Sequence, residues 1–136
     1  MSTAVIYARV SSTNDRQNTQ RQIEDLTRFA NSNNYNIIGT YEEHISGATK
    51  NENRTVLMEC LDFCVSQNAN FLLLSELSRL GRSTLQVLKS LEMLHEAGVS
   101  VYIQNLGIYT LNATGEANPV ASIMVMFFRN GEHRAF

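Results

Sequence analysis

Arginine and serine side chains gather in two short segments of the sequence, each directly after a run of apolar residues. The first segment contains Arg9 and Ser11, and the second contains Arg79 and Arg82. Residues two apart in an extended chain point to the same side, and residues three apart on a helical turn face the same way. A serine hydroxyl among guanidinium groups suits nucleophilic attack on a phosphate, because fixed donors stabilise the charge that develops there.

The composition narrows the classes of protein to which the chain can belong. It has 136 residues, is 43% hydrophobic and carries a formal net charge of -2, so it has enough apolar material for one domain with a sizeable core. Nine of its eleven basic residues are arginine, the side chain that can bind phosphate with two parallel hydrogen bonds. The sequence contains no P-loop, no G-x-G-x-x-G and no G-x-S-x-G, so ATP, nicotinamide cofactors and serine hydrolase chemistry have no support.

The cysteines and histidines indicate no metal site. Cys60 and Cys64 lie four apart in a helical pattern and are predicted to be buried core residues of a reducing compartment. The three histidines are scattered, so zinc would lack further ligands. The N-terminus has no signal-peptide pattern, and the longest apolar run, residues 120–128, is too short to span a bilayer. We expect a cytoplasmic protein without a membrane segment.

Short apolar runs alternate with helical periodicity along the chain, which predicts a parallel sheet with helices on both faces. The predicted strands are residues 5–10, 37–41, 71–74 and 99–103, with a short fifth at 107–111. The predicted helices are residues 23–30, 57–65, 83–98, with a Ser83 cap and a Gly98 stop, and 119–128. Ligands of such folds bind outside the carboxyl ends of the strands, where both arginine segments are expected to meet.

The residues alone also allow purely structural interpretations. An arginine at a strand end is often an ion-paired surface residue, and a serine in a strand-to-helix loop is often a helix cap. Fold geometry does not by itself fix function.

Four segments in order resemble a known family. They are YARVSS at 7–12, RQNTQRQ at 16–22, ISG at 45–47 followed by Arg54, and LSRLGRS at 77–83. Together they are similar to the N-terminal catalytic domain of the serine site-specific recombinases, the resolvase/invertase family, over nearly the whole chain. The resemblance implies an α/β fold: a flavodoxin-like, resolvase-like three-layer α/β/α sandwich whose sheet is mostly parallel with a short antiparallel fifth strand.

The resemblance also implies an activity and roles for particular residues. In the family a serine, matched here by Ser11, attacks a DNA phosphodiester, forms a 5′-phosphoserine bond and later returns the strand to a recombined duplex. No ATP, metal or other cofactor is needed. The arginines that match those around the scissile phosphate are Arg9, Arg54, Arg79 and Arg82. The matched glutamines, Gln17 and Gln22, are expected to orient the loop and bind the phosphate, with Tyr7 supporting the site from below.

The chain departs from the family pattern in two places. Many members have Asp where this chain has Ser78, so the general acid is unassigned. The nearby Glu76 does not fill this role, because strand alternation is expected to turn its side chain away from the site. The family's last long helix usually reads Glu-Arg where this chain has Glu132 and His133, and it normally continues into a DNA-binding domain. Residues 1–136 are therefore interpreted as the catalytic domain alone, with the C-terminal DNA-binding domain absent from this chain.

The resemblance implies DNA as partner, and a homodimer that becomes a tetramer in the synaptic complex through the apolar last helix. Two other functions compete with this interpretation. One is a non-catalytic assembly module that regulates full-length recombinases. The other is a small α/β enzyme that binds a phosphorylated small molecule.

Overall fold

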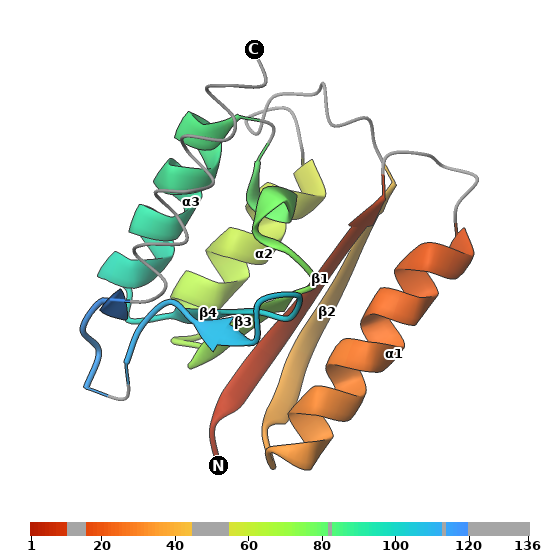
Figure 1. Cartoon of the computed structure of the whole chain (residues 1–136), viewed down its shortest axis with the longest axis horizontal. Coiled ribbons are helices and arrows are strands. Elements are labelled where there is room, and N and C mark those ends of the chain that lie inside the picture. The colour runs from red at the N-terminus through yellow and green to blue at the C-terminus, as the bar shows by residue number, and fades with distance from the viewer. Residues whose placement is uncertain (11–15, 45–54, 82, 113, 120–136) are drawn as a thin grey trace.

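A computed structural model of the chain describes residues 1–10, 16–44, 55–81, 83–112 and 114–119. Within these residues five strands form one sheet in the order β2-β1-β3-β4-β5 (Figure 1). The strands are β1 (Thr3–Val10), β2 (Asn36–His44), β3 (Phe71–Leu74), β4 (Ser100–Ile103) and β5 (Ile108–Tyr109). The first four pair in parallel and β5 runs antiparallel to β4, which confirms the predicted sheet and its short fifth strand.

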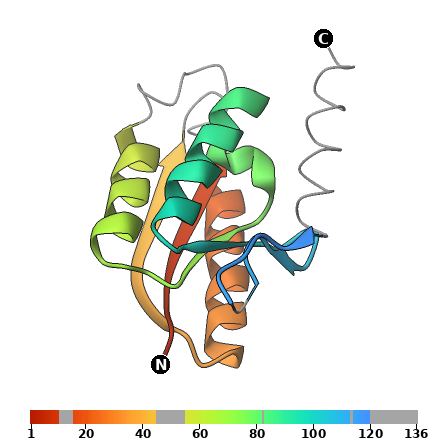
Figure 2. The same ribbon diagram turned by 90° about the vertical axis from the view of Figure 1, so that its left-hand side faces the viewer.

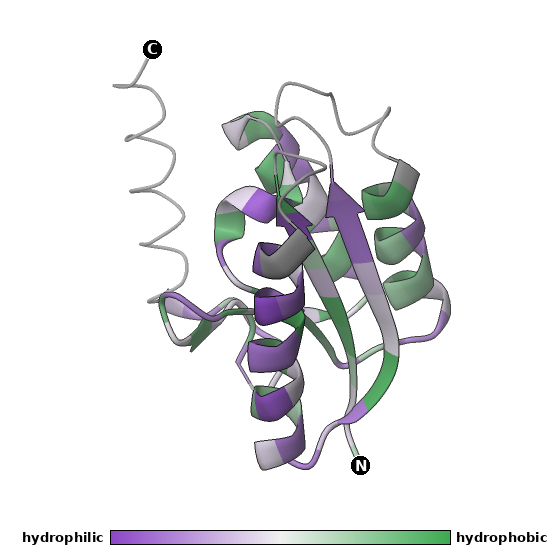
Figure 3. Ribbon diagram, turned by 90° about the vertical axis from the view of Figure 1, so that its right-hand side faces the viewer, coloured by the Kyte–Doolittle hydropathy of each residue, from purple (hydrophilic) through white to green (hydrophobic). Residues whose placement is uncertain are grey.

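Helices cover both faces of this sheet, as predicted. The helical segments are α1 (Arg16–Ser32), α2 (Thr55–Ser66), the 3-10 turn η2 (Leu77–Leu80) and α3 (Thr84–Glu96). Figures 1 and 2 show α1 on one side of the sheet and α2 with α3 on the other. The outer face of α1 is hydrophilic (Figure 3), as expected for an amphipathic helix that buries only one stripe.

The larger core lies between the sheet and the pair α2 and α3. β1 is apolar along most of its length because both of its faces are covered, and residues 4–8 have no exposed surface. The helix α2 contributes Cys60 and Cys64, which are free and buried, as predicted. A hydrogen bond with Cys64 and burial raise the pKa of the Cys60 thiol, which therefore stays protonated. No cluster suited to holding a metal ion occurs among the described residues.

Aromatic rings fill much of the smaller core, on the α1 side. Phe29 of α1 stacks on Tyr102 of β4 with ring centroids 3.9 Å apart. Tyr35 stacks on Phe71 of β3 at 4.5 Å, and its hydroxyl lies 2.7 Å from that of Tyr109 in β5. These rings attach the C-terminal end of α1 and the start of β2 to the strands β3, β4 and β5.

The helix boundaries follow the sequence signals at α3. Ser83 Oγ accepts a hydrogen bond from the Gln86 amide at 3.3 Å, and Gly98 ends the helix region with a φ of +78°. The structure differs at β2, which runs to His44, beyond the predicted residues 37–41. The predicted helix at 119–128 lies, after Pro119, outside the described residues. None of the described helices combines the length and apolar character needed to cross a membrane.

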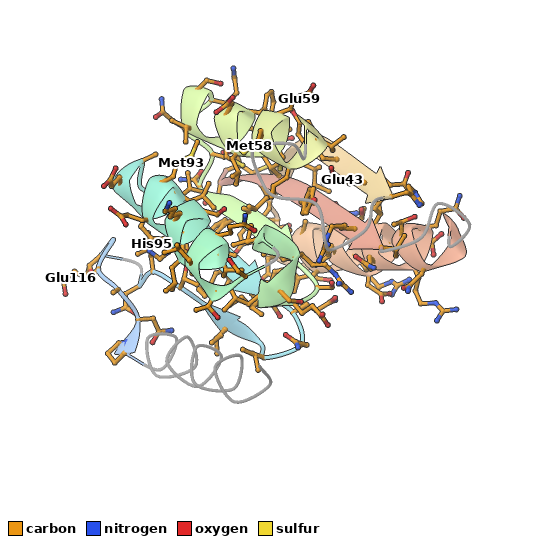
Figure 4. All side chains as sticks on the ribbon, turned by 90° about the horizontal axis from the view of Figure 1, so that it is seen from above. Glu43, Met58, Glu59, Met93, His95 and Glu116 are labelled. Atoms are coloured by element: carbon orange, nitrogen blue, oxygen red, sulfur yellow. The ribbon has the colours of Figure 1, made fainter. Side chains whose placement is uncertain are left out.

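His95, on α3, makes the stability of this fold depend on pH (Figure 4). Its Nε2 lies 2.7 Å from Thr110 Oγ1, and burial lowers the pKa of the ring below its ordinary value of about 6.5. The unfolded chain then binds this proton more tightly than the folded chain. Stability is therefore complete above the unfolded pKa and falls as the pH drops below it.

We expect the denaturant midpoint of the wild type to fall between about pH 7.5 and about pH 5.5, and that of His95→Gln to fall less. Equilibrium unfolding followed by circular dichroism at several pH values measures both. Parallel losses in the two proteins would exclude His95 as the source.

Candidate active site

The carboxyl end of β1 extends beyond its neighbour β3. The two strands pair only from Ala4 to Ile6, whereas β1 continues beside β2 as far as Val10. This separation lies at the upper end of the sheet in Figure 1, where β1 and β2 end. The backbone groups on that edge of β1 need other hydrogen-bond partners, because buried peptide groups are nearly always satisfied.

Gln22 of α1 provides those partners. Its Nε2 donates to the carbonyl oxygen of Arg9, and its Oε1 accepts from the Arg9 amide, both at 3.3 Å. Ser75, just after β3, also donates to this Oε1 at 3.5 Å. The side chain of Gln22 is buried, and its amide bonds Arg9 as a neighbouring strand would. It therefore holds the backbone two residues before Ser11, and its predicted phosphate contact stays a prediction.

The two arginine segments meet at Arg9. Its side chain is buried, and its Nη2 donates to the carbonyl oxygen of Ser78 at 3.3 Å, although the two residues are 69 positions apart. Arg79 follows directly, and its Nη1 lies 3.5 Å from Glu76 Oε1. Two guanidinium groups from distant segments are thus placed at the carboxyl end of the sheet.

A buried carboxylate that the sequence analysis missed lies beside them. Glu43 of β2 is 3% exposed and is the register partner of Arg9. Its Oε1 accepts a hydrogen bond from the hydroxyl of Tyr7, which is fully buried. Figure 4 looks onto this end of the molecule and labels Glu43 between α1 and α2. Tyr7 therefore contacts Glu43 in the core, and its predicted support of the site stays a prediction. The signal that could have indicated Glu43 is its place as a polar residue near the carboxyl end of a strand.

The turn after β3 also differs from expectation. Glu76 was predicted to point away, but its Oε1 accepts from Ser78 Oγ at 2.7 Å and pairs with Arg79. The prediction is wrong because Glu76 is still extended but the turn η2 that follows it folds Ser78 and Arg79 back toward its side chain, which strand alternation does not describe.

The remaining predicted site residues are not placed by the structure. Their side chains lie outside the described part of the chain: Ser11, Gln17, Arg54 and Arg82. The described part contributes two guanidinium groups: that of Arg9 donates to the Ser78 carbonyl, and that of Arg79 pairs with the Glu76 carboxylate. Such groups can stabilise negative charge on a phosphate without a metal ion.

The family of the chain follows from comparison with known proteins. Residues 4–129 match the family model described as "Resolvase, N terminal domain". The chain belongs to this family. It is a resolvase-family catalytic domain of the serine recombinases, a membership that supports recombinase activity and implies a DNA substrate and assembly of several subunits. No curated protein matches the chain significantly.

Several solved structures share its fold. The N-terminal catalytic domain of TP901-1 integrase is 22% identical with a TM-score of 0.73, covering 98% of both chains. A resolvase family site-specific recombinase from Streptococcus pneumoniae is 22% identical with a TM-score of 0.75, covering 99% of this chain and 90% of that one. The C-terminal catalytic domain of ISC1926 TnpA, an IS607-like serine recombinase, is 28% identical with a TM-score of 0.64, covering 74% and 69%.

Replacing Gln22 tests its contact with Arg9. We expect Gln22→Leu to lower the free energy of unfolding by about 1–3 kcal/mol, because it leaves buried backbone groups unsatisfied. The matched control is Gln20→Leu on the exposed side of α1, which removes no such bond and should change stability little. Urea unfolding of the three proteins measures the difference. Equal stability of Gln22→Leu and the control would contradict the assigned role.

Proposed function

We propose that the chain cleaves and rejoins DNA, with Ser11 as the nucleophile. The hydroxyl oxygen of Ser11 attacks a backbone phosphorus, a 5′-phosphoserine bond forms, and the 3′-oxygen of the broken strand leaves as a hydroxyl. A hydroxyl from a second cleaved strand then attacks the phosphoserine and releases Ser11. The energy of the phosphodiester bond is kept in the enzyme–DNA bond, so the cycle consumes no nucleotide.

The observation that carries this proposal is the contact between Arg9 and Ser78. It brings the strand that leads to Ser11 against the turn that contains Arg79. A phosphate under attack gains negative charge, and the guanidinium groups of Arg9 and Arg79, with those proposed for Arg54 and Arg82, supply the opposite charge. Gln17 is proposed to contact the same phosphate.

The proposal includes the assembly in which the reaction occurs. Strand exchange joins ends from two duplexes, so several active sites must act together. We infer that the chain forms a homodimer and that two dimers form a tetramer on two DNA sites. The tests below need cleavage at defined sites, so they use the chain fused to a DNA-binding module of known sequence preference.

The first test detects the covalent bond to DNA. The fused protein is incubated with a duplex that carries two module sites around a spacer, and denaturing gels with mass spectrometry measure a protein–DNA adduct. We expect an adduct on Ser11 in the wild type, none in Ser11→Ala, and retention in the neighbouring Ser12→Ala control. An adduct in Ser11→Ala would exclude Ser11, and a wild type that binds the sites without cleaving them would favour the assembly module.

The second test separates charge stabilisation from DNA binding. Removing a guanidinium that contacts the developing charge typically slows the reaction by about 10²–10³-fold, so Arg79→Ala should cleave that much more slowly. Its DNA affinity should fall by only about tenfold or less, because one phosphate contact is lost among several. Single-turnover cleavage and binding titrations measure the two effects. The matched control is Arg28→Ala, whose exposed side chain pairs with Asp25 on α1; equal losses of rate and affinity in Arg79→Ala would indicate a binding role.

A further inference from the structure

The turn after β3 holds a carboxylate against one of the two arginines. Glu76 precedes η2 in an extended conformation, with φ -155° and ψ 156°. The turn then brings residues two and three positions later back toward its side chain. The same oxygen, Oε1, accepts from Ser78 Oγ at 2.7 Å and lies 3.5 Å from Arg79 Nη1.

This short segment therefore orients both guanidinium groups. The backbone carbonyl of Ser78 accepts from Arg9, and the carboxylate of Glu76 pairs with Arg79. The side chain of Arg79 is 22% exposed and that of Glu76 is 41% exposed. Ion pairs this close to solvent contribute little to stability, so the pair is better suited to orientation than to holding the fold together.

We propose that Glu76 is a positioning residue for Arg79, and this rests on the proposed function of the site. An arginine side chain has many rotamers, and a reaction accelerates only when the donor is aligned with the developing charge. The carboxylate of Glu76 limits the rotamers of Arg79 through their 3.5 Å contact, and the Ser78 hydroxyl, which donates to the same oxygen, fixes the carboxylate. Ser78 thus shares in the task through Glu76.

The charge of Glu76 gives this role a distinctive signature. A carboxylate near a DNA phosphate repels it, so neutralising Glu76 should not weaken DNA binding. Losing the carboxylate should nevertheless slow cleavage, because Arg79 is then misaligned. The cleavage rate should therefore fall while the DNA affinity does not, whereas local damage to the turn would reduce both.

The experiment uses the chain fused to its DNA-binding module and the duplex described above. We expect Glu76→Gln to cleave about tenfold more slowly in single turnover while binding DNA equally or up to about threefold more tightly. The matched control is Asp25→Asn, which removes an exposed carboxylate with the same spacing to its arginine, Arg28, at 3.3 Å. The control should change neither quantity.

A second variant moves the carboxylate instead of removing it. Glu76→Gln combined with Ser78→Asp places a carboxylate directly before Arg79, and we expect it to recover cleavage to within about threefold of the wild type. Ser78→Ala alone should slow cleavage less than Glu76→Gln, because the carboxylate remains. Thermal unfolding of each variant establishes that it is folded.

Three results would overturn the proposal. They are wild-type cleavage by Glu76→Gln, equal losses of rate and affinity in that variant, and a folded double variant that cleaves no faster than Glu76→Gln. Each of these leaves the proposed function standing, because the wild type still cleaves. Failure of the proposed function is a separate result: no adduct forms with the wild type.

Discussion

The site depends on the last part of β1, where β3 no longer pairs with it. β1 must extend past β3 to leave space at the carboxyl end of the sheet, and the Arg9 peptide groups on that edge then need a donor and an acceptor. A primary amide offers both from one side chain, which a hydroxyl or a carboxylate does not do in the same geometry. Gln22 meets this need and links α1 to β1 and, through Ser75, to the end of β3.

Charge balance follows from the same arrangement. A buried guanidinium is costly unless its donors are bonded, and Arg9 is buried against the carbonyl of Ser78. Glu43 lies opposite Arg9 in register and is itself bonded by Tyr7, while Glu76 pairs with Arg79. A carboxylate thus accompanies each of the two arginines.

The sequence predicts the elements far better than the contacts between them. Apolar runs and the Ser83 and Gly98 signals locate strands and the α3 boundaries, because burial and capping act locally. Glu43 was missed because the last residues of β2 are polar, so the hydropathy pattern does not show that the strand continues to His44. Glu76 was misplaced because alternation describes only a continuing strand, and the turn η2 after Glu76 folds Ser78 and Arg79 back toward its side chain. The contact of Gln22 with Arg9 joins two elements, and helical periodicity carries no information about it.

The aromatic core at the other end of the sheet helps to hold the contacts of Arg9 in place. Gln22 reaches Arg9 only if α1 keeps its position over the sheet, and a helix attached along one edge alone would be free to tilt. The stacking of Phe29 on Tyr102 attaches the C-terminal end of α1 to β4, and the stacking of Tyr35 on Phe71 attaches the segment between α1 and β2 to β3. Because β3 also leads into the Ser78 turn, the same packing holds two residues that bond Arg9, Gln22 and Ser78. The aromatic core at one end of the sheet therefore supports the contacts of Arg9 at the other end.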